Sequence, residues 1–540
     1  FRSERQQYGY RPAFTPNPVG FCSNGRVMIR DSQLDLQFLE DDGTWKSISL
    51  LDAARRSLEA QGYRLPDWDA YAKSGSTLRA GARCAGIACL GIGSGPFADE
   101  RVAADDRGGL YTLIDGSESA LRFAVLLHSP DGGRSWAAYP LTAPGVPFSS
   151  YTAHMEVPSS PGPLKDTPAI LIHEKAASHG ADDAFLRRDP ASGRYLWSWT
   201  TPNDLYLVVP KRNRDGSLSL PSPRLVSTGT ICCGEHSGSE NQAVSAGDSI
   251  FIAYPGDQPL RDPVAGRWGT PEYIVEFSRK KGAVVTPRPL LLGIGFDGPA
   301  ANDNFLNPRT KPPLSPPYAD DHDQPALAIG RDGRIRAIVG GHDARLRYLE
   351  SKRPRAIDRG WSAPRTIGVE PNRAMPDADE YTYPSLMLDA GGSPNVVARW
   401  AGAHYHFSLA YLRFDSKTSR WEQRLLVDPG RPYYGVWYHR LSVDPSGRLF
   451  LSDSYFPQNL FADEARIFAA AWDFPEMAPA PAAPGKAPCP LTDSGAPGSN
   501  YCPYIHYGRV SPSILMSPGG GRPFRLATTH DFFVSSDGKP

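Results

Sequence analysis

SPDGGRSW, residues 129–136, has the composition of a tight β-hairpin. Its two glycines supply the positive φ angles that such a turn needs. Asp131 can accept hydrogen bonds from the amides of the turn, and Trp136 is large enough to pack between neighbouring sheets. The stretch is therefore a structural signal of an all-β protein and not a catalytic motif.

Strand patterns separated by glycine-containing turns recur along the chain. Examples are GLYTLID (109–115), SIFIAYP (249–255), RIRAIVGG (334–341), SPNVVARW (393–400) and RLFLSDSYF (448–456). Most lie about 50 to 80 residues apart, the spacing of four-stranded propeller blades with long insertions. One helix is predicted over residues 50–61, where Leu51, Ala54 and Leu58 share one face.

An internal repeat places polar and aromatic residues at equivalent points of successive blades. Residues 235–257, 320–351, 380–414 and 437–456 each begin with such residues, followed by an apolar strand, an Asp/Gly turn and a second apolar strand. In a propeller the first strand lines the central channel, so these positions should converge at one rim. At the strand starts they are His236, Glu240, Asn241, Asp321, His322, Tyr381, Tyr383, Tyr438 and His439; the second strands end at His342, Arg399 and Trp400.

The charge balance narrows the range of partners. The 540-residue chain has 58 Lys and Arg against 58 Asp and Glu. This balance, with no basic block, argues against a nucleic-acid binder that neutralises phosphates. No apolar run reaches the roughly 18 residues of a membrane span. We therefore expect a monomer with neither a nucleic-acid nor a membrane partner.

The cysteines suggest an oxidising compartment. The pairs Cys84 and Cys89, and Cys489 and Cys502, each flank a loop, as disulfides of exported proteins do. Buried free thiols are the alternative. The total of seven leaves at least one thiol unpaired. We therefore expect a secreted or periplasmic protein.

Composition also suggests how the chain is divided. Residues 1–475 form the predicted propeller and catalytic domain. Residues 476–504 are rich in Pro and Ala and read as a loop or linker. Residues 505–540 form a C-terminal segment in which the strand 522–530 is predicted to close the ring against strands near Arg26–Ile29.

Two reactions and a metal site are the chemical options for a rim of this kind. Glycoside hydrolysis needs two carboxyl groups across the bond, but Asp320, Asp321 and Asp323 are more typical of turns. A metal site from the histidines has no H-E-x-x-H spacing to fix it. Elimination on a uronic acid needs a cation on the carboxylate, a base and an acid. Arg399 could supply the cation, and Tyr383 or His322 the base or acid.

The same residues resemble a known family. DDHDQPALAIGRDGRIRAIVGGHDARLRY, YTYPSL, VVARW and WYHR, within residues 320–440, are similar to BNR-repeat polysaccharide lyases, above all the seven-bladed ulvan lyases. The order of His322, His342, Tyr383, Arg399 and Tyr438 matches that family's pattern, and SPDGGRSW matches its Asp-box. The resemblance implies an all-β, seven-bladed β-propeller with long insertions and one short N-terminal helix.

The resemblance also implies a role for each matching residue. Tyr383 would be the catalytic base or acid, or both, with His322 beside it. Arg399 and His342 would bind and neutralise the uronate carboxylate, and Tyr438 would position a sugar. The other predicted substrate-binding residues are His439, His236, Asn241, Trp400 and Tyr381.

The implied reaction is β-elimination on a uronate polysaccharide. Ulvan is the first choice of substrate, and no cofactor is required. A structural calcium or zinc ion stays unassigned; for the zinc that some members of the family carry, no convincing cysteine set follows Tyr438. The alternatives are an exolyase acting on rhamnosyl-glucuronate ends of plant gums, a propeller glycoside hydrolase and a non-catalytic sugar-binding propeller.

Overall fold

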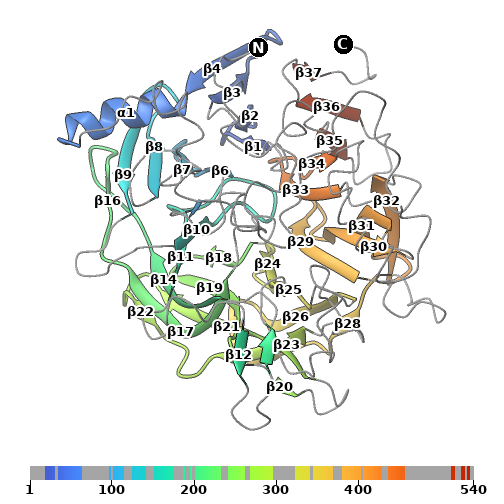
Figure 1. Cartoon of the computed structure of the whole chain (residues 1–540). Helices are drawn as coiled ribbons and strands as arrows, with labels where there is room; N and C mark the ends of the chain where they lie inside the picture. The colour runs from blue at the N-terminus through green and yellow to red at the C-terminus, as the bar shows by residue number, and fades with distance from the viewer. Residues whose placement is uncertain are drawn as a thin grey trace, which may run out of the picture.

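The structure is a computed structural model of the whole chain. It describes residues 19–30, 35–63, 97–98, 101–114, 124–141, 151–175, 186–188, 195–197, 201–232, 241–258, 260–261, 268–295, 323–340, 345–368, 380–402, 406–427, 436–455, 513–516, 524–528 and 532–534. Strands dominate this part, with one helix, and the sheets are arranged radially about a common centre (Figure 1).

The first three sheets of a consecutive run hold the N-terminal half. The first contains β6 (Val102–Ala104), β7 (Leu110–Ile114), β8 (Val125–Ser129) and β9 (Ala137–Pro140). The second contains β10 (Tyr151–Met155), β11 (Ile170–Lys175), β14 (Thr201–Val208) and β17 (Arg224–Cys232), with β5 (Phe97–Ala98) parallel to β10. The third contains β18 (Ala243–Ala246), β19 (Ser249–Pro255), β20 (Leu260–Arg261), β21 (Trp268–Ser278), β22 (Ala283–Val284) and β23 (Leu290–Gly295).

The next three sheets complete the run. The fourth contains β24 (Ala326–Ile329), β25 (Ile335–Val339), β26 (Arg347–Arg353), β27 (Ala356–Trp361) and β28 (Arg365–Thr366). The fifth contains β29 (Glu380–Leu388), β30 (Pro394–Gly402), β31 (His406–Asp415) and β32 (Arg420–Val427). The sixth contains β33 (Val436–Val443), β34 (Leu449–Tyr455), β35 (Ser513–Met516), β36 (Phe524–Thr528) and β37 (Phe532–Val534). Two small hairpins, β12 (Leu186–Arg188) with β13 (Tyr195–Trp197) and β15 (Lys211–Arg212) with β16 (Leu218–Ser219), lie outside these sheets.

An N-terminal sheet lies between the two ends of this run. It contains β1 (Val19–Phe21), β2 (Val27–Arg30), β3 (Asp35–Leu39) and β4 (Trp45–Ser49), and β1 contacts both β6 and β33. The prediction of an all-β propeller is confirmed. Over the described strands, the consecutive run comprises six sheets rather than the seven blades predicted, and the N-terminal sheet fills the gap between its first and last members.

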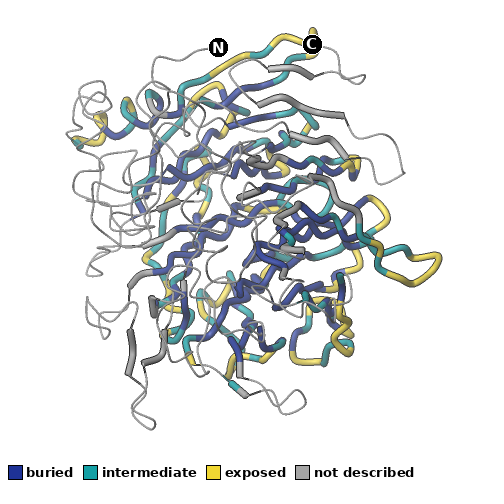
Figure 2. Tube along the Cα trace, turned by 45° about the vertical axis from the view of Figure 1, so that its right-hand side comes forward, coloured by how far each residue is buried: buried dark blue, intermediate teal, exposed yellow. Residues whose placement is uncertain are grey.

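The core lies between neighbouring sheets. Phe251 and Ile274 of one sheet, for example, pack against Ala337 and Val339 of the next. The innermost strands are buried along most of their length, while the turns are exposed (Figure 2). Burial on both faces explains why these strands are largely apolar.

The single described helix, α1 (Leu50–Ala60), follows β4 directly. Ser49 caps it, with its side chain accepting a hydrogen bond from the Asp52 amide at 3.2 Å. Leu50, Ala54 and Leu58 are buried on the face that packs on the first sheets. The helix predicted over residues 50–61 is confirmed.

The SPDGGRSW stretch forms the predicted turn between β8 and β9. Asp131 Oδ1 accepts hydrogen bonds from the amides of Arg134 and Ser135 at 3.0 and 2.9 Å. Gly132 and Gly133 have φ angles of 71° and 99°. Trp136 packs against the core cluster of the N-terminal sheets. Its role is structural, as expected.

The C-terminal strand β36 belongs to the sixth sheet, and its closing of the ring against strands near Arg26–Ile29 stays a prediction. β36 pairs with β35 and β37, whereas β2 pairs only with β1 and β3 among the described strands. The segment 476–504 and both predicted cysteine pairs lie outside the described residues. Cys22 is a buried free thiol, and its burial raises its pKa. The described part contains no helix long and apolar enough to cross a membrane.

Candidate active site

One end of the central channel is closed by a segment that follows β10. The Ser159 carbonyl accepts a hydrogen bond from the Leu388 amide at 2.8 Å, and its hydroxyl accepts one from the Ile329 amide at 3.2 Å. Leu164 donates its amide to the Ala104 carbonyl at 2.9 Å. The segment therefore crosses the ends of β24, β29 and β6.

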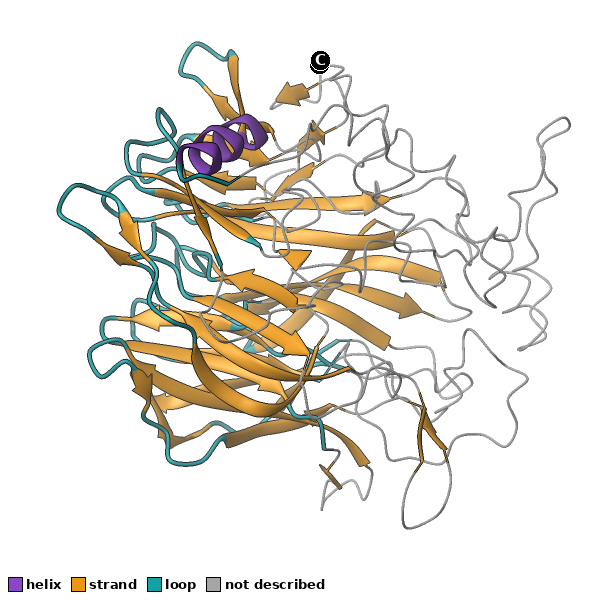
Figure 3. Ribbon diagram, turned by 60° about the vertical axis from the view of Figure 1, so that its left-hand side comes forward, coloured by secondary structure: helices purple, strands orange, loops and turns teal. Residues whose placement is uncertain are grey.

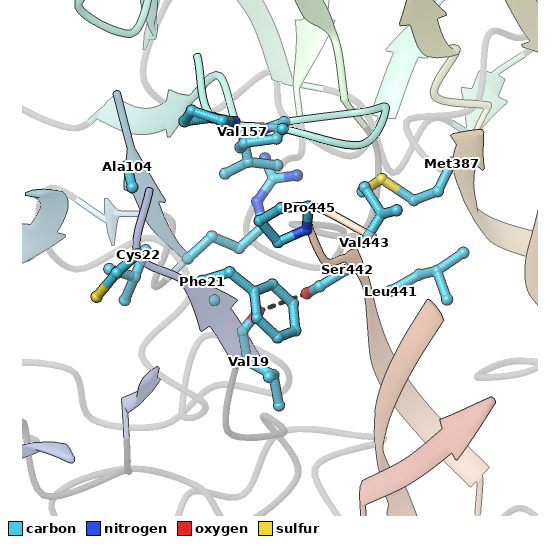
Figure 4. A pocket seen from close by; sticks show the side chains of 16 residues that line it. Val19, Phe21, Cys22, Ala104, Val157, Met387, Leu441, Ser442, Val443 and Pro445 are labelled. Atoms are coloured by element: carbon cyan, nitrogen blue, oxygen red, sulfur yellow. Dashed lines mark hydrogen bonds between the residues drawn. The ribbon is translucent and has the colours of Figure 1, made fainter. Parts of the chain in front are cut away.

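Little space remains at this closed end. A cavity of about 30 Å³ lies among β1, β6, β33 and residues 157–163 (Figure 4). Such a volume holds no more than about two water molecules. The described turns gather on this same face of the molecule (Figure 3). The other end of the channel is the opposite rim, where the inner strands begin.

Tyr383 lies near the start of β29 with an unusual backbone. Its φ angle is 59°, in the left-handed region that costs a non-glycine residue about 1 kcal/mol or more. The strand pairing shifts here, because Thr382 pairs with Arg399 but Ser385 pairs with Val397. Tyr383 and Pro384 thus form a β-bulge opposite a single residue of β30. The bulge sets the direction of the Tyr383 ring, which is 3% exposed.

Arg399 lies at the end of β30, at the same rim as Tyr383. Its guanidinium carbon is 4.7 Å from the centroid of the Tyr383 ring, a cation–π contact. The Arg399 side chain is buried, with 4% exposed. The guanidinium group stays charged even when buried and can bind a carboxylate through two parallel hydrogen bonds. The pairing of Tyr383 with Arg399 is the main feature of the candidate site.

A second bulge occurs at the start of β33. Its pairing with β34 shifts between Val436 and His439, so Trp437 and Tyr438 lie in the irregular part. The backbone of Tyr438 is thus at the predicted place, but its side chain lies outside the described residues. Two neighbouring inner strands therefore both depart from regular pairing at the same rim.

His439 connects β33 to β30. Its Nε2 is 3.0 Å from the Val397 carbonyl, which can only accept, so Nε2 carries the proton. Burial and, to a smaller extent, the charges of Arg440 and Arg399 together lower the pKa of His439 to about 3. The ring is neutral at neutral pH and fully buried. It supports the strand that carries Arg399 and does not face a ligand directly.

Asn241, predicted to bind substrate, is instead held between sheets. Its Oδ1 accepts a hydrogen bond from Arg101 at 3.0 Å, and its Nδ2 donates to the Val157 carbonyl at 3.3 Å. Arg101 also donates to the Met155 carbonyl at 3.1 Å. Both ends of the amide are occupied, so its observed role is to tie inner strands together.

Tyr381 and Trp400 are placed in the core and not in the channel. Tyr381 is fully buried, and its hydroxyl donates to Gln423 at 2.6 Å. Trp400, its cross-strand partner, packs against the same apolar cluster. The prediction that Tyr381 contacts substrate is corrected on this ground, because a ligand could reach it only if the sheets separated.

A buried polar group near the rim was missed by the sequence interpretation. Gln242 donates a hydrogen bond to Gln324, and its Oε1 lies 3.3 Å from Nε2 of His173. Burial lowers the pKa of His173 to about 4, so its ring is neutral. The internal repeat contained the signal, since Gln242 and Gln324 occupy equivalent positions before β18 and β24.

Several predicted residues lie outside the described part of the chain. They are His236, Glu240, Asp321, His322 and His342. Within the described part, no three His, Cys, Asp or Glu side chains gather in a way that could hold a metal ion. The structure thus brings together Tyr383, Arg399 and His439.

Comparisons with known proteins agree with the BNR-repeat resemblance. Residues 302–452, which include Tyr383 and Arg399, match the model of the BNR repeat-containing family member. No curated protein matches the chain. The prediction of a BNR-repeat propeller is confirmed for this segment.

Among solved structures, the chain is similar to a PL25 ulvan lyase bound to -[GlcA(1-4)Rha3S]-. The identity is 15% and the TM-score 0.28, over 40% of this chain and 45% of the lyase. The chain thus spans less than half of the lyase's length. The NanB sialidase of Streptococcus pneumoniae gives 11% identity and a TM-score of 0.35, over 66% of this chain and 64% of the sialidase. A Bombyx mori GH32 β-fructofuranosidase gives 12% and 0.28, over 55% and 54%. Likenesses at this level carry no argument about activity.

Proposed function

We propose that this protein is an exported polysaccharide lyase that cleaves a uronic-acid-containing polysaccharide by β-elimination, with ulvan as the first candidate substrate. The observation that carries the proposal is the contact of the buried Arg399 with Tyr383 at the rim where the inner strands begin. A fixed cation and a phenol lie side by side there, and a strained bulge holds the phenol in place. These are two of the groups that elimination requires.

The reaction balances with one proton removed and one delivered. A base removes the proton from C5 of the uronate, and the electron pair forms the C4–C5 double bond as the C4–O bond breaks. The leaving oxygen takes a proton from an acid. Arg399, helped by His342, would neutralise the carboxylate next to C5 and so make its proton removable. Tyr383 would serve as base or acid, with His322 beside it, and Tyr438 would position a sugar.

This assignment needs no cofactor, and we propose that the protein acts as a monomer. The closed channel end supports entry of the sugar chain from the rim only.

The test is the absorbance near about 235 nm of protein incubated with ulvan, gum arabic and other uronate polymers, because elimination leaves a double bond conjugated to the carboxylate. A rise with one polymer would establish the chemistry and the substrate class. New reducing ends without this absorbance would indicate a hydrolase. Binding without either signal would indicate a sugar-binding propeller.

The Tyr383→Phe variant then tests the site. Loss of the hydroxyl should lower the rate about a hundredfold or more, within the range expected for a proton-transfer group. Tyr411→Phe is a matched control, because Tyr411 of β31 lies in the same sheet and donates its hydroxyl to Asn395 of β30 at 2.6 Å. Equal rates in the two variants would remove Tyr383 from the mechanism.

A further inference from the structure

A second hollow lies on the face opposite the candidate active site. It has a volume of about 360 Å³ and is lined by segments that meet at the tight-turn end of the sheets. Its charged lining residues are Arg107, Lys211, Arg212, Arg224, Arg279 and Asp166. Because the inner strands run from the rim that carries Tyr383 and Arg399 to this face, a ligand here would not touch those two residues.

Two of the five cations are bound within the protein and form the wall of the hollow. Arg212 pairs with Asp105 and donates to the Tyr111 hydroxyl at 2.6 Å. Arg279 donates to the Thr167 carbonyl at 2.9 Å. Both side chains are largely buried, with 15% and 13% exposed. They shape a fixed surface, and their charges are balanced by the buried carboxyl groups beside them.

The other three cations are exposed and their side chains have no polar partner among the described residues. Arg107 lies in the turn after β6, Lys211 in the β15 hairpin and Arg224 at the start of β17. Three separate segments thus bring positive charges to one hollow, which contains the single carboxylate Asp166. Unpaired like charges repel one another, and a bound anion would relieve that repulsion.

We propose that this hollow is a binding site for the oxyanion groups of an acidic polysaccharide, separate from the catalytic rim. Sulfate esters and uronate carboxylates share the required chemistry, a compact negative group with several hydrogen-bond acceptors. Arg107, Lys211 and Arg224 would contact the anion, while the wall formed by Arg212 stays fixed. Such a site would hold a long sugar chain on the protein between cleavage events.

The experiment measures binding of the full-length protein to dextran sulfate, which has sulfate esters but no uronate, and to polygalacturonate, which has uronate but no sulfate. The variant Arg107→Ala/Lys211→Ala/Arg224→Ala removes three charges from the hollow. The control Lys46→Ala/Lys352→Ala/Arg420→Ala removes three exposed charges elsewhere. Titration calorimetry at two salt concentrations gives Kd for each polymer.

We expect the hollow variant to raise Kd about tenfold for at least one polymer, and the control to change it less than about twofold. The polymer that responds identifies sulfate or carboxylate as the preferred group. Equal effects of the two variants, or none, would overturn the proposal. Neither polymer needs to be cleaved, so the result does not depend on the proposed lyase activity.

Discussion

The left-handed backbone of Tyr383 predicts that glycine is more stable than alanine at this position, the reverse of their usual order in a strand. In a regular strand, glycine is less stable than alanine by about 0.5–1 kcal/mol, because glycine loses more conformational freedom on folding. At Tyr383, with φ at 59°, alanine keeps the backbone strain and glycine relieves it. The strain is worth about 1–2 kcal/mol for a residue with a Cβ atom. Tyr383→Gly should therefore be more stable than Tyr383→Ala by about 0.5–1 kcal/mol.

Both variants lose the same ring, so their difference isolates the backbone. Tyr383 is almost fully buried, and each variant should lose about 3–5 kcal/mol relative to the parent protein. The same pair of substitutions at Tyr381 is the control. That residue lies in the same strand, is equally buried and is not among the residues with positive φ.

The assay is equilibrium unfolding in urea, with the midpoint compared at constant slope. At Tyr381 alanine should be the more stable variant, and at Tyr383 glycine should be. If alanine were the more stable at both positions, the bulge would carry no strain, and the reasoning that links strain to function at Tyr383 would fail.

Three further predictions concern other parts of the molecule. Burial lowers the pKa of His439 to about 3, below its unfolded value near 6.5, so the unfolded chain binds the proton more readily. The free energy of unfolding should therefore fall as the pH drops from about 6.5 towards 3, by up to about 1.4 kcal/mol per pH unit. Urea unfolding measured at a series of pH values should show a shallower loss for His439→Gln than for the parent protein. In Gly109→Ala the new Cβ would lie 2.6 Å from Arg212 Nη2, so thermal unfolding should show a loss of about 1–3 kcal/mol. Gly391→Ala, whose new Cβ would lie 3.3 Å from Asp389 Oδ1, should stay within about 1 kcal/mol. Asp131→Ala removes the acceptor of two turn amides, so the free energy of unfolding should fall by about 1–2 kcal/mol in the same assay while turnover stays unchanged. A large loss of turnover at equal stability would contradict the purely structural role of this turn.

Local features of the fold were predictable from the sequence. The helix at residues 50–61 followed from one apolar face, and the SPDGGRSW turn from its glycines and Asp131. The repeat correctly placed Tyr383 and Arg399 at one rim. Each of these depends on residues close in sequence, or on a pattern that a propeller repeats.

Features that depend on strand partners were not predictable. Strict alternation would put Tyr381 and Tyr383 on the same face of β29, but the bulge at Tyr383 and Pro384 breaks it. The proline was the available signal, since proline within a sheet favours bulges. The stretch 522–530 has no pattern that selects one partner over another, and the pairing of β36 with β35 and β37 follows from the whole sheet.

The closure at Ser159 also bears on how the chain is synthesised. The Ser159 hydroxyl can accept its hydrogen bond only after Ile329, 170 residues later in the sequence, has been synthesised. At about 5–20 residues per second, the ribosome needs about 10–30 seconds to supply that partner. During this interval the nascent chain has its early sheets but lacks the strands that its central segment must join. Slow or interrupted translation between these two points should therefore expose this segment to chaperones and proteases.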